Sequence, residues 1–278
     1  MNTIGRIRPV LDQCLRAAGE IQRASFMRVD QQAVETKAHD YDLLTIVDTD
    51  SENAIVDIIR QNFPDHHILT EEAGALANER QTPGQPDAAD AAPAVRWVID
   101  PLDGTTNYSH GFPAFGISIG IELDGVTQLG AVYNPVREEL YQAQRGHGAT
   151  LNGQPIHVSA ADELGKALLV TGFPYDRRER IDHYLALYRA FTMKAHGVLR
   201  LGSAALDLCH VASGQLDGYY EESLNPWDWT AGWLILEEAG GKVSDYHGEG
   251  RVFERRQLCA SNTRLHQQML DILGPSVS

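Results

Sequence analysis

Cysteine is scarce in this chain, and long apolar runs are missing altogether. The three cysteines, Cys14, Cys209 and Cys259, are odd in number and widely spaced, and no CxxC pair occurs. We therefore expect reduced, buried thiols in a cytoplasmic protein, not disulfides or a zinc site. No apolar stretch approaches the roughly 20 residues that span a bilayer, and none near the N-terminus is long enough for a signal peptide. The sequence thus argues against a membrane protein.

Positive charge is also in short supply. The chain carries 23 Lys and Arg against 38 Asp and Glu, which gives a net charge of −15 at pH 7. Proteins that bind nucleic acids present basic faces to the phosphates, so direct nucleic-acid binding is not expected. An enzyme that acts on an anionic substrate would need this negative charge offset locally, and bound divalent cations would do so.

Two common nucleotide-binding motifs are absent as well. The chain has no GxGxxG and no GxxxxGK[ST]. Nothing therefore supports a dinucleotide-binding protein or a P-loop enzyme.

Hydrophobic periodicity predicts helices and strands in similar numbers. Apolar residues at spacings of three and four predict helices at 4–25, 50–63, 180–194, 203–213, 229–239 and 264–273. Short or alternating apolar runs predict strands at 66–70, 95–99, 115–123, 128–133, 139–144, 167–171, 215–221, 242–246 and 258–261. Residues 73–94 carry no apolar period, and we expect an exposed loop there. A single α+β or mixed α/β domain over residues 1–278, with halves of about 1–160 and 161–278, is the simplest arrangement.

The densest polar cluster follows the strand predicted at 95–99. Residues 97–107 read WVIDPLDGTTN, so an apolar run ends in two carboxylates, Asp100 and Asp103. Pro101 is expected to end the strand and turn the chain, which would aim both acids at one point. Such hard oxygen ligands suit Mg²⁺, and a helix beginning after Gly104 would present free N–H groups to a phosphate. Taken alone, the segment also fits an ordinary Asp-Gly turn.

Further acidic positions support a metal site. Glu71 and Glu72 follow a predicted strand, Asp228 stands at the start of an apolar helix, and Asp48 precedes another predicted helix. Each position also has a plainer explanation. The two glutamates fit a solvated surface pair, and the two aspartates fit helix capping.

Several neighbouring residues are interpreted as structural. Trp227 and Trp229 bracket Asp228 and are expected to pack, not to form a binding platform. His110 follows the 97–107 segment closely, but the sequence gives it no role in substrate contact. The basic run at 177–180 is interpreted as the solvated start of a helix. Together with Lys194 and Arg200 it could instead supply a second phosphate pocket for a bisphosphate substrate.

The acidic segments together resemble the inositol monophosphatase family, within the superfamily of lithium-sensitive, Mg²⁺-dependent sugar phosphatases. The family's signature Asp-Pro-x-Asp-Gly-Thr-Thr-Asn stands complete at 100–107, and its Glu-Glu pair after a strand stands at 71–72. Its Trp-Asp-x-x-Ala-Gly pattern stands at 227–232, and its Asp-Leu-x-Thr-x-x-Asp segment at 42–48. The motifs occur in the family's order, and the resemblance covers nearly the whole chain.

The resemblance implies two to three Mg²⁺ ions. A first ion would be held by Glu71, Asp100 and the carbonyl of Leu102. A second would be held by Asp100, Asp103 and Asp228, with Asp228 supplied by the C-terminal half. A third, weaker ion would lie near Glu71.

The resemblance also implies catalytic and substrate contacts. Asp48 and Thr45 would lie beside the nucleophilic water, which Thr105 would orient. The backbone N–H groups of Gly104 and Thr105 would hold the phosphate, and Lys37 would belong to a mobile active-site loop. Substrate contacts are implied for four positions: Glu221, Gly202, Ser203 and Ala204.

The implied fold is a layered α-β-α-β-α sandwich, usually dimeric, and the implied enzyme is a phosphoric monoester hydrolase. The leading expectation is hydrolysis of myo-inositol monophosphate, or a similar phosphorylated polyol or sugar, by a metal-activated water. Alternative substrates are fructose-1,6-bisphosphate, histidinol phosphate, 3′-phosphoadenosine 5′-phosphate and NADP(H). A non-enzymatic alternative is an accessory factor in transcription or ribosome maturation.

Overall fold

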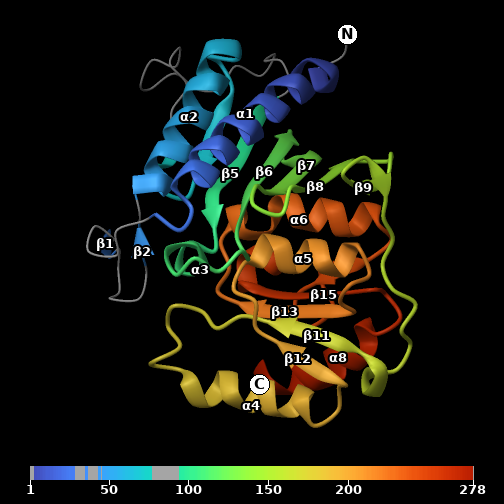
Figure 1. Cartoon of the computed structure of the whole chain (residues 1–278). Coiled ribbons are helices and arrows are strands. Elements are labelled where there is room, and N and C mark those ends of the chain that lie inside the picture. Colours follow the sequence, from blue (N-terminus) through green and yellow to red (C-terminus); the bar gives the residue numbers. More distant parts are fainter. Residues whose placement is uncertain (1–2, 29–34, 37–42, 45, 77–93, 278) are drawn as a thin grey trace.

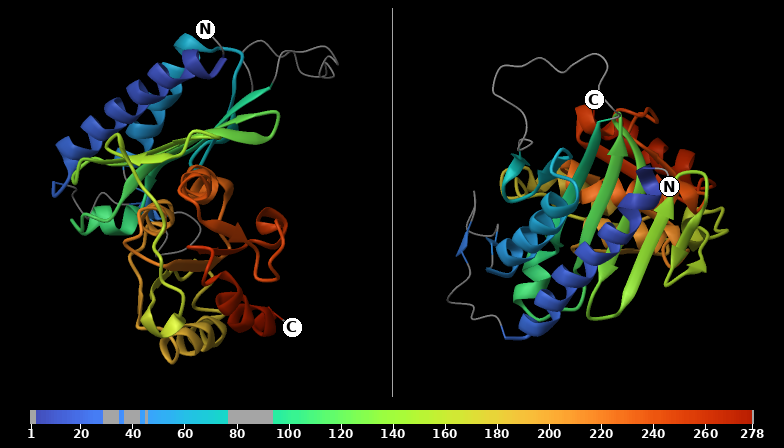
Figure 2. Two further views of the ribbon diagram at one scale, coloured as in Figure 1. Left: turned by 90° about the vertical axis from the view of Figure 1, so that its right-hand side faces the viewer. Right: turned by 90° about the horizontal axis from the view of Figure 1, so that it is seen from above.

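Helices and sheets alternate in five layers. The computed structural model describes residues 3–28, 35–36, 43–44, 46–76 and 94–277. One outer layer is the helix pair α1 (Thr3–Ser25) and α2 (Ile46–Asn62), and the other is α4 (Ile181–Thr192) with α8 (His266–Leu273) (Figure 1). Two sheets enclose a central pair, α5 (Ala204–Ala212) and α6 (Pro226–Glu238), as Figures 1 and 2 show. The predicted α-β-α-β-α sandwich is confirmed. None of the described helices has the length and apolar character needed to cross a membrane.

The first sheet has eight strands in the order β10-β9-β8-β7-β6-β5-β3-β4. Its strands are β3 (His67–Thr70), β4 (Gly74–Leu76), β5 (Val95–Asp103), β6 (Gly116–Leu123), β7 (Val126–Asn134), β8 (Glu139–Gln144), β9 (Ala149–Leu151) and β10 (Gln154–Pro155). Strands β3 and β5 are parallel, with Thr70 opposite Ile99. Because their carboxyl ends meet at one edge of the sheet, the residues that follow, Glu71 and Asp100, become neighbours.

Strand β5 does not turn at Pro101, so that prediction is wrong. The strand continues to Asp103, and its pairing with β6 is irregular between Asp100 and Asp103. Asp100 pairs with Ser118 and Asp103 pairs with Gly116, so β5 contains one more residue than β6 between these two pairs. The extra residue forms a β-bulge where Pro101 lies. A residue without an N–H is tolerated there because the regular hydrogen bonds are already interrupted.

The second sheet has five strands in the order β12-β11-β13-β15-β14. Its strands are β11 (Leu168–Thr171), β12 (Gly197–Leu199), β13 (Gly218–Glu222), β14 (Lys242–Ser244) and β15 (Gln257–Ser261). Strand β11 is parallel to both β12 and β13, and β15 is antiparallel to its two neighbours.

Helix α6 lies very close to the first sheet. A Cβ atom added at Gly130 would come 2.7 Å from the Ala231 carbonyl, and one at Gly120 would come 2.5 Å from the Thr230 methyl. These two strand glycines therefore permit the close approach of the helix. The contact holds the start of α6, with Asp228, against the end of the sheet where Asp100 lies.

The remaining described elements are short, and several were not predicted. They are α3 (Thr105–Ser109), α7 (Val252–Arg255), β1 (Glu35–Thr36), β2 (Leu43–Leu44) and the 3-10 turns at Leu164–Lys166 and Gly274–Val277. The expected loop at 73–94 begins as strand β4, and residues 77–93 lie outside the described part of the chain. Helix α2 begins at Ile46 and helix α6 at Pro226, each a few residues earlier than predicted.

Candidate active site

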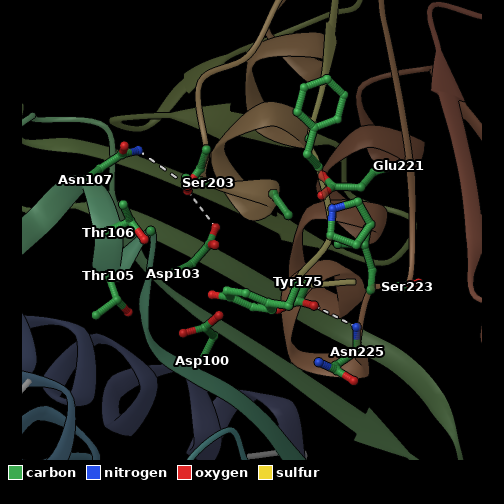
Figure 3. Close-up of a pocket in the computed structure, with 18 of the residues that line it drawn as sticks. Asp100, Asp103, Thr105, Thr106, Asn107, Tyr175, Ser203, Glu221, Ser223 and Asn225 are labelled. Carbon is green, nitrogen blue, oxygen red and sulfur yellow. Dashed lines mark hydrogen bonds between the residues drawn. The ribbon is translucent and has the colours of Figure 1, made fainter. Parts of the chain in front are cut away.

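One cavity of about 590 Å³ collects the predicted acidic residues. Glu71, Asp100, Asp103 and Asp228 all line it, although they come from three segments far apart in the sequence. Figure 3 shows Asp100 and Asp103 on one side of this space and Glu221 on the other.

The carboxylates of Asp103 and Asp228 are each fixed by a helix start. Asp103 Oδ2 accepts hydrogen bonds from Ser203 Oγ at 2.6 Å and from the N–H of Ala205, in the first turn of α5, at 2.8 Å. Asp228 Oδ2 accepts from the backbone N–H of Asn225 at 2.6 Å, as part of a capping box. The capping explanation for Asp228 is therefore correct, and it is compatible with a place in the cavity wall.

Mutual repulsion makes the ionised cluster costly. Burial, together with the charges of Glu71, Asp103 and Asp228, raises the pKa of Asp100 well above its ordinary value. Burial also raises the pKa of Asp103 to about 6, although the hydrogen bond from Ser203 works against it. The pKa of Asp228 is raised well above normal by burial and by Glu71. Buried carboxylates with this much repulsion need a positive charge to ionise together.

The donor set fits a hard divalent cation. Carboxylate oxygens and the nearby Leu102 carbonyl are the ligands that Mg²⁺ prefers, and an open cavity leaves room for its waters. Among the described residues, no three His, Cys, Asp or Glu side chains are already grouped tightly enough to enclose an ion. The acids therefore share the cavity without closing on a common point.

Glu52 orders the chain next to Glu71. This buried α2 side chain accepts a hydrogen bond from the backbone N–H of Glu72, at 3.1 Å from its Oε2. It thereby fixes the turn after β3 that brings Glu71 into the cavity. Sequence reasoning missed Glu52, because it stands within a helix 20 residues away from its partner.

Thr105 links the cavity to a buried carboxylate behind it. Its hydroxyl oxygen lies 2.9 Å from Asp48 Oδ1 and 3.0 Å from the Leu102 carbonyl oxygen. Asp48 is fully buried in the first turn of α2, not ahead of the helix as predicted. Gly104 adopts a left-handed conformation (φ 95°), and a Cβ there would lie 2.9 Å from a backbone carbonyl oxygen. Helix α3 then begins at Thr105, as predicted.

The predicted substrate-contacting residues belong to the wall of the same cavity. Glu221, Gly202, Ser203 and Ala204 all line it. Burial raises the pKa of Glu221 to about 7, and the Tyr219 hydroxyl donates to its Oε2 at 2.5 Å. Two other predicted site residues, Thr45 and Lys37, lie outside the described residues.

A model of the inositol monophosphatase family matches residues 6–276 of this chain. The chain belongs to the inositol monophosphatase family. An inositol-1-monophosphatase from Synechocystis sp. is 43% identical over 243 residues, or 87% of this chain and 80% of the relative. A Nus factor SuhB from Pasteurella multocida is 38% identical and covers 97% of both chains.

Solved structures of inositol monophosphatase family members share the fold. The inositol monophosphatase from Anabaena (Nostoc) sp. PCC 7120 superposes with a TM-score of 0.83 at 40% identity, over 99% of this chain and 97% of the other. The family is typically Mg²⁺-dependent, in agreement with the donor set of the cavity. The relatives named above, which are 43% and 38% identical to this chain, carry two different names, one of an enzyme and one of a Nus factor.

The family signature includes Asn107, whose role sequence reasoning missed. Its side-chain amide donates to the carbonyl oxygens of Ala114 at 2.7 Å and Leu201 at 2.8 Å. These bonds tie the segment after β5 to the segment before α5. Asn107 therefore holds the two halves of the cavity wall together.

A segment before α4 closes the outer wall of the cavity. Tyr175, Arg177, Arg200 and His110 line it. Of these, the sequence had suggested Arg177 and Arg200 only for a second phosphate pocket, and Tyr175 had no predicted role. Trp227 lines it as well, so its predicted packing role is incomplete. The sequence could not place these residues, because their position depends on how the loops fold over the sheet ends.

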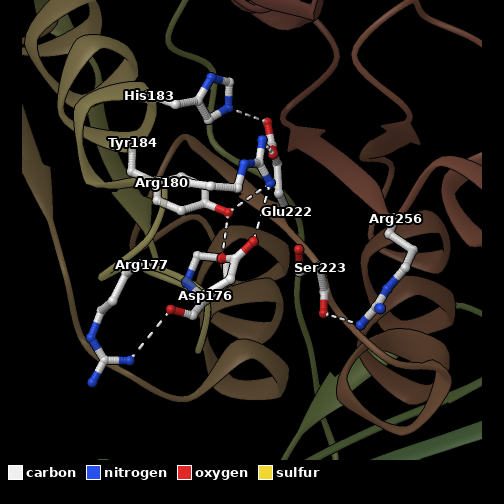
Figure 4. A network of polar contacts seen from close by, with 9 residues as sticks. Asp176, Arg177, Arg180, His183, Tyr184, Glu222, Ser223 and Arg256 are labelled. Carbon is white, nitrogen blue, oxygen red and sulfur yellow. Dashed lines mark hydrogen bonds and ion pairs between the residues drawn. The ribbon is translucent and has the colours of Figure 1, made fainter.

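Glu222 anchors this outer wall to the second sheet. Its carboxylate forms an ion pair with Arg180 at 3.1 Å and contacts His183 Nε2 at 2.8 Å (Figure 4). Arg180 also pairs with Asp176 at 3.3 Å. The network fixes the turn that carries Tyr175 into the cavity.

A serine-hydrolase motif also occurs in the chain, but the structure rules it out. Residues 116–120 read GISIG and match GxSxG. Ser118 lies within strand β6, fully buried, and its hydroxyl donates to the Trp227 carbonyl. It has neither the strand-to-helix turn nor the exposure that a nucleophilic serine requires.

Asp207 extends the acidic cluster beneath Glu221. It is fully buried in α5, and neither carboxylate oxygen has a hydrogen-bond partner among the described residues. Burial and the neighbouring Glu221 raise its pKa well above normal. Burial without a hydrogen-bond partner therefore disfavours the charged form of this carboxyl group.

Proposed function

We propose that this protein hydrolyses a small phosphate monoester, most simply myo-inositol monophosphate or a similar polyol phosphate. One observation supports this most strongly: four carboxylates and a helix start surround one cavity, and Thr105 in its wall contacts the buried Asp48. Its size of about 590 Å³ suits a small ligand.

The acidic residues would hold Mg²⁺. Glu71, Asp100 and the Leu102 carbonyl would bind one ion, and Asp100, Asp103 and Asp228 a second, with a third and weaker ion near Glu71. When bound, the ions supply positive charge to the phosphate oxygens and lower the pKa of a coordinated water.

Thr105 would orient the attacking water. Its hydroxyl hydrogen is directed at Asp48 or at the Leu102 carbonyl, so the oxygen lone pairs remain to accept a hydrogen bond from water. Asp48 would take part by accepting the hydroxyl proton of Thr105 in a hydrogen bond at its Oδ1. The first backbone N–H groups of α3 have no partners within the helix, and those of Gly104 and Thr105 would bind the phosphate oxygens.

The alcohol part of the substrate would face the second sheet. Glu221 is held by Tyr219 and would accept hydrogen bonds from substrate hydroxyls, while Gly202, Ser203 and Ala204 would lie along the ring. From the family resemblance we also infer a homodimer, and roles for Thr45 beside the water and Lys37 in a mobile loop. Sedimentation velocity would test the dimer.

Phosphate release with a panel of substrates tests the activity. We expect Mg²⁺-dependent release from inositol monophosphate that a chelator abolishes. Asp100→Asn should remove activity while the fold persists, and the exposed control Asp162→Asn should keep it. Near-normal turnover by Asp100→Asn in Mg²⁺ would refute the metal assignment. Faster phosphate release from fructose-1,6-bisphosphate, histidinol phosphate, 3′-phosphoadenosine 5′-phosphate or NADP(H) would identify that compound as the preferred substrate instead.

A second candidate function is an accessory role in transcription or ribosome maturation. The supporting observation is that Nus factor SuhB relatives match at 38–40% identity over nearly the whole chain. Affinity purification with the Asp100→Asn variant separates the two functions. A transcription-machinery partner retained by the inactive variant would favour the accessory role.

A further inference from the structure

A second surface groove lies away from the candidate active site. Its volume is about 370 Å³, and it shares no lining residue with the acidic cavity. Its floor is helix α6, one side is the turn between β6 and β7, and the other side is the segment around α7. The groove is therefore independent of the proposed hydrolysis.

Two tryptophans form the floor of this groove. Trp229 and Trp233 are four residues apart on α6, so they lie on the same face of the helix. Their ring centroids are 5.3 Å apart with the planes inclined by 51°. Both rings pack partly against the central core, yet both remain half-buried. The packing role predicted for Trp229 is thus only part of its environment.

Exposed apolar side chains stand on both walls. Val126, at the β6–β7 turn, is 48% exposed, and Phe253, on α7, is 64% exposed. Apolar side chains beside a pair of half-buried tryptophans, with polar residues around them, are the arrangement expected of an interaction site. Tryptophan is among the residues that contribute most to binding energy in protein interfaces, and phenylalanine is enriched in the cores of such interfaces.

The rim of the groove is acidic. Glu122, Glu237 and Glu254 line it, against a single cation, Arg145. Glu122 is paired with Arg96 and Glu237 with Arg145, but the exposed Glu254 has no ion pair among the described residues. The exposed Glu254, together with the chain net charge of −15, favours a basic partner over a second copy of the protein or a nucleic acid.

We propose that this groove binds a segment of another protein that presents Arg or Lys beside an apolar side chain. The apolar side chain would pack between Phe253 and Val126 over the tryptophan rings. The cation would lie against a tryptophan face and within reach of Glu254. Neither feature is needed for hydrolysis of a small phosphate ester.

Selection from a random peptide library displayed on phage tests this inference without assuming a partner. The intact protein serves as bait, and synthetic versions of the enriched peptides are measured by fluorescence polarisation. We expect enriched peptides that combine Arg or Lys with an aliphatic or aromatic residue. Replacing the basic residues of a peptide with Glu should weaken binding by about tenfold or more.

Two exposed positions supply variants that leave the core intact. Phe253→Ser and Glu254→Lys should each weaken peptide binding by about tenfold. The controls are Met193→Ser, an apolar residue 74% exposed outside the groove, and Glu20→Lys, an exposed acid on α1. Both controls should bind as the parent does. Enriched peptides without basic residues, or peptides that bind both groove variants as tightly as the parent, would overturn the proposal.

Discussion

Gly172 permits the position of Glu221, and replacing it with alanine should impair catalysis. A Cβ at Gly172 would lie 2.1 Å from both carboxylate oxygens of Glu221 and 2.2 Å from the carboxylate carbon. Ordinary contacts with a Cβ begin near 3.4 Å, so the carboxylate must retreat by about 1 Å. Because the clash involves the far end of a flexible side chain, Gly172→Ala should still fold.

The retreat of Glu221 would remove two interactions. The hydrogen bond from the Tyr219 hydroxyl, 2.5 Å long, would break, and the proposed contact with substrate hydroxyls would be lost. A hydrogen bond to a charged group contributes about 1.5–3 kcal/mol, which corresponds to a fall in kcat/KM of about 10- to 150-fold. If the contact serves ground-state binding, the loss should appear chiefly as a higher KM.

Steady-state kinetics on inositol monophosphate, with thermal unfolding as a check of folding, measure this effect. Gly165→Ala is the matched control, since the nearest atom to a Cβ there is 3.8 Å away. Glu221→Gln should lower kcat/KM similarly, and the double variant with Gly172→Ala should be little worse than either single one. An unchanged kcat/KM in Gly172→Ala, or additive losses in the double variant, would refute this account.

Three further predictions concern the metal site and the core. Glu52→Ala should raise the Mg²⁺ concentration for half-maximal activity about tenfold, because the Glu72 N–H loses its acceptor. Glu52→Gln keeps an acceptor oxygen and should need about as much Mg²⁺ as the parent. The same Mg²⁺ requirement in Glu52→Ala and the parent would contradict this. Li⁺ on the order of millimolar should inhibit phosphate release, and indifference to it would weaken the family-based mechanism. Burial lowers the pKa of His266 from 6.5 to about 4, and both ring nitrogens contact serine hydroxyls. Its neutral form therefore stabilises the fold above pH 6.5, and this contribution is lost as the pH falls towards 4. In urea unfolding, the change in stability between pH 7 and 5 should be about 2 kcal/mol less favourable for the parent than for His266→Gln. An equal change in both proteins would refute it.

Most longer elements were predictable because they leave periodic patterns within one stretch of chain. Helix α1 and strands β6 and β8 lie close to their predicted ranges. Short elements such as α7 and β12 contain too few residues to establish a period. The starts of α2 and α6 were predicted late, since the first turn of each contains an acid, Asp48 or Asp228, that interrupts the apolar pattern.

The four acids and the glycine-threonine segment were recognisable because they stand in short, ordered motifs. The family match then agreed with that resemblance. The outer wall of the cavity could not be placed from the sequence. Arg200, Tyr175 and the Glu222 network come together only through loops that fold across the ends of the second sheet.

The sequence by itself determined the chemistry available to this protein: hard oxygen ligands, an anion-binding turn and alternating layers of helix and sheet. Only the tertiary structure decided where these groups meet. Strand pairing set Glu71 beside Asp100, and close packing of α6 on strand glycines added Asp228. Local periodicity indicates which face of a helix or strand is buried. Which other element that face packs against depends on how whole layers of helix and sheet bury one another, and this involves residues from the entire chain.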